Sequence, residues 1–127
     1  MAEDRRGLKI KEDGLGEVQI AEEVITIIAG LAATEVEGVC SMGGNITKEL
    51  VSRLGMKNLS KGVRIEVDEE DKVQVYVTIN IAYGYAIPEV SRNVQEKSKS
   101  AIENMTGLEV SGVNVRIAEV DMKGAAE

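Results

Sequence analysis

The side chains of this chain that could do chemistry are almost all carboxylates, lysines and arginines. Its 127 residues include 22 Asp and Glu and 15 Lys and Arg, but no His and a single Cys, Cys40. Histidine is the usual proton carrier near neutral pH and the commonest metal ligand, and a cysteine nucleophile needs a neighbouring base. We therefore expect no enzyme activity, no cofactor and no metal site. Cys40 is expected to pack as a small apolar residue in a reducing compartment, because it has no partner for an internal disulfide.

One stretch of this acidic chain is basic. The net charge of the chain is −7, but residues 48–64 contain a single acid, Glu49. Their basic residues are Lys48, Arg53, Lys57, Lys61 and Arg64. This local reversal of sign fits an anionic surface, such as a partner's acidic patch or lipid headgroups, or it is ordinary solvated charge. We take these five residues as candidate partner-binding residues.

Two of the three tyrosines lie together. Tyr83 and Tyr85 flank Gly84 at the exit of a long alternating segment. Tyrosine is favoured at interfaces because a rigid apolar ring carries a polar tip, so both are candidate partner-binding residues, although they could instead cover the end of a helix. Nucleic-acid binding is not expected, since the net charge is negative and Tyr76 is the one clear stacking platform on the expected sheet.

The elements that must position these residues follow from the periodicity of the apolar residues. Alternation of apolar and polar residues indicates half-buried strands. Strand-like segments are 16–20, 39–42, 63–67, 73–81 and 113–117. The two central segments are separated by the acidic run 68–71 and should form an antiparallel hairpin. That run reads as a solvated hairpin tip, because it lacks the spacing and the glycine of a calcium loop.

Three segments have helical periodicity. The segment that begins at Ala21 has one apolar face at Val24, Ile27, Ile28 and Leu31 and a second at Ile25, Ala29, Ala32 and Val36. A helix that is apolar on two sides is either central to its own fold or shared with a partner. Residues 46–54 read as a short amphipathic helix. The last helix begins near Pro88, which suits a first turn, and ends at Gly107.

The order of elements predicts a two-layer α+β fold with a mostly antiparallel sheet and helices on one face, in the order β-α-(α)-β-β-α-β. We expect a flexible charged arm over residues 1–14, one domain over 15–120 and a flexible tail over 121–127. The most apolar window, 24–33, is about half as long as a membrane span. With no signal peptide at the N-terminus, a cytoplasmic location is expected.

The chain resembles the alkaline shock protein family, the envelope-stress proteins of Gram-positive bacteria. The likeness covers about residues 14–120. Its most specific part runs from the sequence YGYAIPEV at 83–90 to Gly107 and Leu108, with the GEVQIA segment at 16–21 in the N-terminal half. The shared positions are turn, cap and core residues, which bear on the fold rather than on a site.

The resemblance implies a small cytoplasmic, non-enzymatic domain without assigned catalytic residues. Relatives are associated with cell-envelope homeostasis, in some cases held at the membrane through a separate anchoring protein and able to self-associate. We therefore expect a homo-oligomeric adaptor or scaffold that docks a protein partner, with a membrane-anchoring protein as one candidate. The alternative, implied by other branches of the family, is a regulatory protein of fatty-acid synthesis that binds the carboxylase or an anionic ligand.

Overall fold

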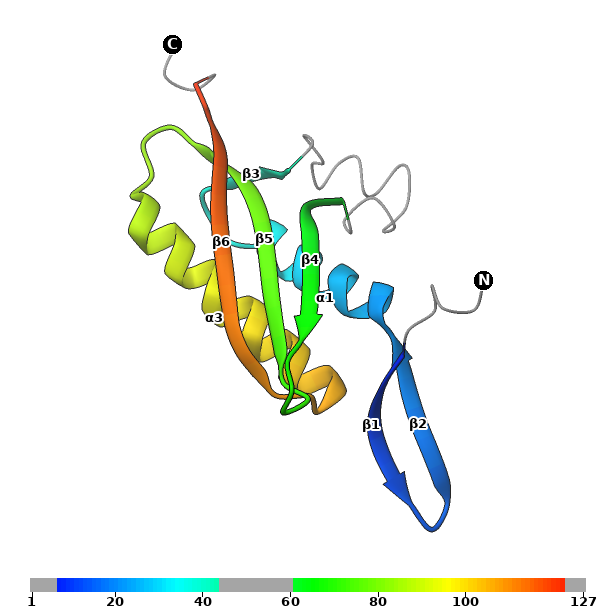
Figure 1. Ribbon diagram of the computed structural model, residues 1–127. Helices are drawn as coiled ribbons and strands as arrows, with labels where there is room; N and C mark the ends of the chain where they lie inside the picture. The colour runs from blue at the N-terminus through cyan, green and yellow to red at the C-terminus, as the bar shows by residue number, and fades with distance from the viewer. Residues whose placement is uncertain (1–6, 44–60, 123–127) are drawn as a thin grey trace.

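The computed structural model describes residues 7–43 and 61–122. Strand β5 (Val73–Ala82) lies at the centre of its main sheet. Strand β6 (Val110–Asp121) runs parallel to β5 along its whole length. The opposite edge is shared by two shorter antiparallel strands. β4 (Val63–Val67) pairs with the first half of β5, and β3 (Val39–Met42) pairs with its end. Figure 1 shows this arrangement.

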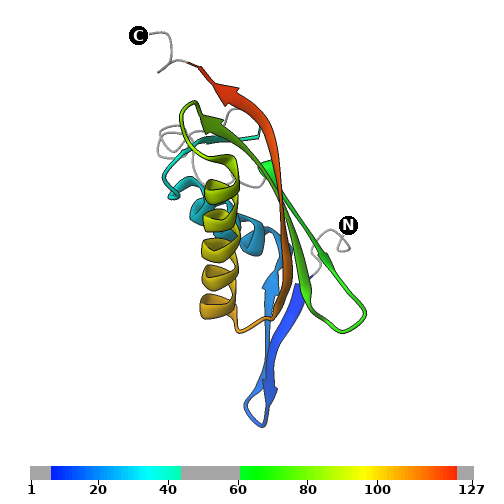
Figure 2. The same ribbon diagram turned by 90° about the vertical axis from the view of Figure 1, so that its left-hand side faces the viewer.

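Two helices cover one face of this sheet and leave the other open. Helices α1 (Glu22–Thr34) and α3 (Ile87–Thr106) lie side by side on the same face (Figure 2). The inward side chains of β5 are at most 1% exposed: Val73, Val75, Val77, Ile79 and Ile81. Full burial of such a side chain contributes roughly 1.5–3 kcal/mol, so β5 is the main anchor of the core. The expected two-layer α+β fold with helices on one face is confirmed.

Helix α3 buries one narrow side against the rest of the fold and leaves its other side exposed. A narrow stripe of side chains is buried: Val90, Val94, Ser98, Ile102 and Thr106. Pro88 lies in the first turn, where a missing N–H costs nothing, and Gly107 ends the helix in the left-handed region at φ 78°. Because glycine has no Cβ, it adopts this conformation without strain.

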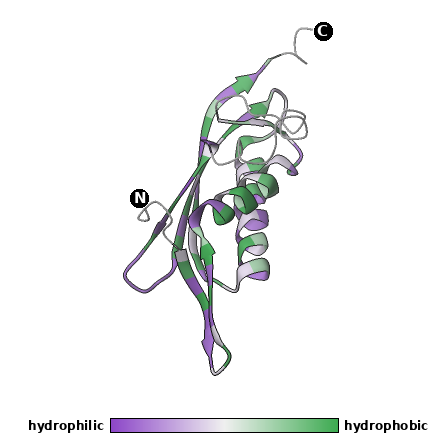
Figure 3. Ribbon diagram, turned by 90° about the vertical axis from the view of Figure 1, so that its right-hand side faces the viewer, coloured by the Kyte–Doolittle hydropathy of each residue, from purple (hydrophilic) through white to green (hydrophobic). Residues whose placement is uncertain are grey.

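Helix α1 uses one of its two apolar faces for the core. Ile25 and Ala29 are fully buried. On the other face, Val24 is 42% exposed, and Ile27 and Leu31 are only partly buried. Figure 3 shows much of α1 coloured as hydrophobic. The helix is therefore central to its own fold and also leaves a second apolar face partly open to solvent.

An N-terminal hairpin projects away from the two layers. Strands β1 (Gly7–Asp13) and β2 (Gly16–Ala21) pair only with each other among the strands that the structure describes, and they extend beyond the main sheet in Figures 1 and 2. Leu15 at its tip is 95% exposed. An isolated two-stranded hairpin is marginally stable in water, so this one depends on its attachment to α1.

The flexible arm expected over residues 1–14 is corrected for residues 7–13, which form β1. The charged residues of this segment conceal an alternating pattern, because Leu8 faces the core while Lys9 faces solvent. Lys9 pairs across the hairpin with Glu17 at 3.3 Å. The charged residues that suggested a flexible arm in the sequence therefore include one that forms a cross-strand contact.

The remaining expected elements are present where the structure describes them. All five expected strands are found, and the piece expected at 113–117 is part of the longer β6, which ends at Asp121. The helix expected over 46–54 lies outside the described residues, as do residues 1–6 and 123–127.

The buried stripe of α3 contains a hydroxyl. Ser98 of α3 is 0% exposed, and its Oγ forms no hydrogen bond to any residue in the described ranges 7–43 and 61–122. An unsatisfied buried polar group costs roughly 1–3 kcal/mol. Ser98 therefore fits the core by its size and not by its polarity.

We expect Ser98→Ala to raise the free energy of unfolding by about 1 kcal/mol, since it removes the unsatisfied hydroxyl and favours the helix. Urea denaturation measures the change. Ser100→Ala is the matched control, because Ser100 is exposed on the same helix and gains only helix propensity. A lower stability of Ser98→Ala than of the wild type would contradict this account.

The turn between α1 and β3 is packed against the start of α3 at Gly38. This residue has φ 101°, and a Cβ added to it would lie 2.8 Å from Val90 Cγ2 and 3.0 Å from the Tyr85 ring. The carbonyl of Gly38 accepts a hydrogen bond from the Ala82 N–H at 2.9 Å. The position therefore needs both a left-handed backbone and the absence of a side chain.

We expect Gly38→Ala to lower the free energy of unfolding by roughly 2–4 kcal/mol, because backbone strain and overpacking add. Thermal and urea unfolding measure the loss. Gly84→Ala is the control: Gly84 has φ 103° but nothing within 4 Å of its added Cβ, so it should lose only the strain, about 1–2 kcal/mol. Equal losses in the two variants would show that the contact with Tyr85 and Val90 carries no weight.

Candidate functional site

Five exposed apolar side chains gather where the loop after β5 meets the end of β6. We call them the tyrosine patch: Tyr83, Tyr85, Ile87, Val120 and Met122. Each is between 40% and 59% exposed. They line one shallow groove, and the Tyr83 N–H donates to the Asp121 carbonyl at 2.9 Å, which fixes the loop against β6. Singly exposed apolar residues are normal on protein surfaces, but a contiguous group marks an interaction site.

A β-bulge places the β6 part of the patch. The register of β5 and β6 shifts after Ile79, which pairs with Ile117, so that Ile81 pairs with Val120. One extra residue, Ala118, turns Val120 to the face that carries Ile81. This is the helix side of the sheet, but the sheet runs on past the start of α3 there (Figure 1). Val120 therefore lies on the helix side of the sheet but is not covered by α3, and it is 40% exposed.

The two sequence-predicted tyrosines have different roles. Tyr85 packs its ring against Gly38 and donates its hydroxyl to Glu37 at 3.3 Å. It therefore covers the N-terminal end of α3 and also contributes to the patch. Tyr83 is 59% exposed and contributes its ring to the surface. Ile87, Val120 and Met122 were not among the predicted site residues, because the bulge that gathers two of them leaves no clear mark in the sequence.

The open face of the sheet carries a second arrangement, formed by cross-strand neighbours. Arg64, Tyr76 and Asn114 lie in one row across β4, β5 and β6. The Arg64 guanidinium lies over the Tyr76 ring, 4.2 Å from its centroid, and pairs with Glu66 at 2.6 Å. The Tyr76 hydroxyl donates to the same carboxylate at 3.3 Å. This contact network holds Arg64 in one position on an otherwise solvated face.

The structure separates the two predicted basic residues that it describes from the predicted tyrosines. Lys61 and Arg64 line a groove on the open face, together with Arg116 of β6, whereas Tyr83 and Tyr85 belong to the helix side. The other three predicted basic residues, Lys48, Arg53 and Lys57, lie outside the described residues. Arg116 was not among the predicted site residues, and only the pairing of β5 with β6 brings it near Lys61 and Arg64.

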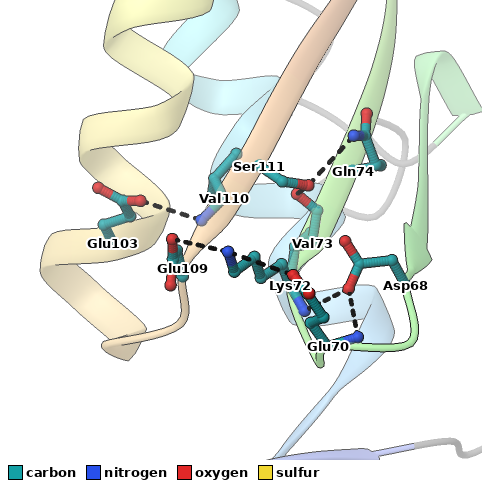
Figure 4. Close-up of polar contacts among 9 residues, drawn as sticks. All are labelled: Asp68, Glu70, Lys72, Val73, Gln74, Glu103, Glu109, Val110 and Ser111. Atoms are coloured by element: carbon teal, nitrogen blue, oxygen red, sulfur yellow. Dashed lines mark hydrogen bonds and ion pairs between the residues drawn. The ribbon is translucent and has the colours of Figure 1, made fainter.

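The acidic run 68–71 forms the hairpin tip that the sequence predicts. The Asp68 carboxylate accepts the backbone N–H groups of Glu70 and Lys72, both at 2.9 Å, and so caps the turn. The Lys72 ammonium lies 3.4 Å from Glu70 and 3.5 Å from Glu109 (Figure 4). The carboxylates thus serve the turn and its lysine. Within the described ranges, no group of three or more metal-ligating side chains is assembled.

Cys40 is partly buried on β3 and donates its thiol to the Asn80 carbonyl at 3.3 Å. Burial, followed by the nearby negative charge of Asp121, raises the pKa of this thiol above its ordinary value. The thiolate is the reactive form of cysteine, so a raised pKa keeps Cys40 protonated and unreactive near neutral pH. Its environment is that of a packing residue.

Comparison with known proteins gives a family-level match over most of the chain. The profile of the alkaline shock protein 23 family, described by a cell envelope-related function, matches residues 10–122. The chain is 38% identical over 113 residues to uncharacterized protein YqhY of Bacillus subtilis (strain 168), a match that covers 89% of this chain and 83% of that protein. It is 34% identical over 107 residues to uncharacterized protein YloU of the same organism, with 83% and 88% covered.

A more distant relative carries a functional name. The stress response regulator gls24 homolog of Streptococcus pyogenes is 28% identical over 111 residues, which cover 85% of this chain and 60% of the relative. No solved structure matches the chain. None of the helices in the described ranges has both the length and the hydropathy that crossing a membrane requires. The match of the family profile over residues 10–122 confirms the family that the sequence resembles.

Proposed function

The chain belongs to the alkaline shock protein 23 family, whose function is cell envelope-related, and on that premise we propose that it is a non-enzymatic adaptor of the envelope stress response. In this proposal it self-associates and docks a protein partner through the tyrosine patch. A membrane-anchoring partner would hold the protein on the cytoplasmic side of the envelope. The name of the gls24 relative, a stress response regulator, agrees with this assignment.

The tyrosine patch is the observation that carries the proposal. It contains two tyrosines, a residue type enriched among interface positions whose truncation costs at least 2 kcal/mol. Each ring has only two side-chain torsions to fix on binding, so little conformational entropy is lost. Covering apolar surface contributes about 25 cal/mol per Å², and the five side chains together supply an apolar centre for an interface.

The position of the patch favours docking of a protein surface. It lies at one end of the fold, where the loop after β5 is fixed by the Tyr83–Asp121 backbone bond and by the contact of Tyr85 with Gly38. A surface that is already ordered needs little rearrangement on binding. The outer edge of β6 begins beside the patch, and none of the strands in the described part of the chain pairs with it. Such an edge can add a strand from a second chain.

We expect the double variant Tyr83→Ser, Met122→Ser to weaken self-association by at least tenfold, about 1.4 kcal/mol, because it removes the two most exposed side chains of the patch. Sedimentation velocity over a range of protein concentrations measures the dissociation constant. The matched control is Met105→Ser, which removes a 70% exposed side chain of α3 outside the patch. The control should associate as the wild type does.

The same variants test partner docking by quantitative capture from native lysate. Partners retained by the wild type and by Met105→Ser should be lost with the double variant. A wild-type protein that sediments as a monomer at all concentrations and retains nothing would reject the adaptor function. Retention that is equal in all three proteins would exclude the tyrosine patch as the docking surface.

A further inference from the structure

We infer that the open sheet face holds a binding site for a small molecule that carries a phosphate group. The site is the groove lined by Lys61, Arg64, Tyr76, Thr78 and Arg116, which we call the cationic groove. It lies on the face opposite the tyrosine patch. The inference goes beyond the proposed adaptor function and does not depend on it.

Strand pairing brings the cationic side chains to the groove. Arg64 lies opposite Tyr76, and Arg116 lies opposite Thr78 on the other side of β5. Adjacent strands are about 4.8 Å apart, so the two arginines start from outer strands about 10 Å apart, with Tyr76 and Thr78 between them. Lys61 lines the same groove just before β4. The hollow measures about 430 Å³, which falls in the size range of small-molecule sites.

The charge of the groove is opposite to that of the chain. The lining of the groove contains three cationic side chains and no carboxylate, and Arg64 is already paired with the neighbouring Glu66. Lys61 and Arg116 form no ion pair with any residue that the structure describes. The groove therefore has a surplus of two positive charges in a protein of net charge −7. Positive charges held near each other repel, and an anion between them would reduce that repulsion.

A phosphate group matches this surplus better than a carboxylate does. A phosphate monoester carries close to two negative charges at pH 7 and three strong acceptor oxygens, whereas a carboxylate carries one charge. Each guanidinium presents a planar fork that fits phosphate oxygens. Thr78 also lines the groove, and a threonine hydroxyl can donate a hydrogen bond to a further phosphate oxygen. Arg64 is held by Tyr76 and Glu66, so less of its entropy is lost on binding.

The neighbouring row offers a contact for the rest of the ligand. The Asn114 side-chain amide donates to Gln74 Oε1 and to the Val75 carbonyl, both at 3.0 Å. Its orientation is thereby fixed, and its own carbonyl oxygen is directed away from those acceptors and can accept a hydroxyl or amine. The groove does not suit a polynucleotide, since Tyr76 is its one aromatic and Arg64 lies over one face of that ring, whereas single-strand binders stack successive bases on several aromatic side chains.

Amide NMR titrations of the full chain test the inference at constant ionic strength. The probes are inorganic phosphate, glycerol 3-phosphate and adenosine monophosphate, which separate free phosphate, a lipid-headgroup fragment and a nucleotide. We expect saturable shifts of the amides of residues 61–64, 76–78 and 114–116, with at least one monoester binding about tenfold more tightly than inorganic phosphate. Higher salt should weaken all three.

Variants of single arginines localise the effect. Arg116→Gln should weaken binding at least fivefold. Arg116→Lys keeps the charge but loses the planar guanidinium, so its affinity should lie between those of the wild type and Arg116→Gln. Arg92→Gln is the matched control, because it removes one exposed arginine from α3, outside the groove, and should bind as the wild type does. The Arg116 side chain is exposed, so unfolding curves of the variants should be unchanged. Sedimentation should also be unchanged, which separates this test from that of the adaptor function.

Three results would overturn the inference. One is shifts that rise linearly without saturation for all three probes. Another is equal affinity of Arg116→Gln and the wild type. The third is saturation of the same amides by a glutamate-rich peptide where the phosphates fail, which would assign the groove to an acidic protein segment.

Discussion

The division of β5 into one wholly apolar side and one polar side is the constraint on which the rest of the structure depends. Its five inward side chains are at most 1% exposed, and α1 and α3 are needed to keep them so. Its outward side chains, among them Tyr76 and Thr78, lie on the face that the helices leave open. Because side chains alternate strictly along a strand, β5 fixes the core and the solvated face at once.

Both candidate surfaces arise from the limits of this arrangement. The tyrosine patch lies on the apolar side, where the sheet extends past the start of α3 and Val120, the strand neighbour of the buried Ile81, is 40% exposed. The cationic groove lies on the polar side, where strand pairing places Arg116 near Lys61 and Arg64. Since opposite faces of one sheet carry them, a protein partner and a small ligand would not compete for the same contacts. Surfaces of this kind agree with a chain that has no histidine and one partly buried cysteine, whose pKa is raised by burial.

Much of the fold could be predicted from the sequence, because local pattern and tertiary environment agree in β4, β5 and α3. Strict alternation identified the strands, and Pro88 and Gly107 marked the ends of the last helix. β1 was missed because its charges mask the alternation of Leu8 with Lys9. The inner face of α1 could not be chosen, since both faces are apolar and only packing against the sheet decides. Of the candidate surfaces, the sequence places Tyr83 and Tyr85 together, and their role in binding stays a prediction. The bulge at Ala118 and the parallel β5–β6 pairing, which complete the two surfaces, depend on contacts between distant segments.

If exposed surfaces rather than reactive groups carry the function, self-association should be visible in amide hydrogen exchange of the full chain compared at low and high protein concentration. Higher concentration should slow exchange in residues 81–87 and 118–122, around the tyrosine patch, and leave exchange in residues 61–66 of the open face unchanged. Exchange that is independent of concentration throughout, or protection confined to residues outside these two segments, would contradict self-association through the tyrosine patch.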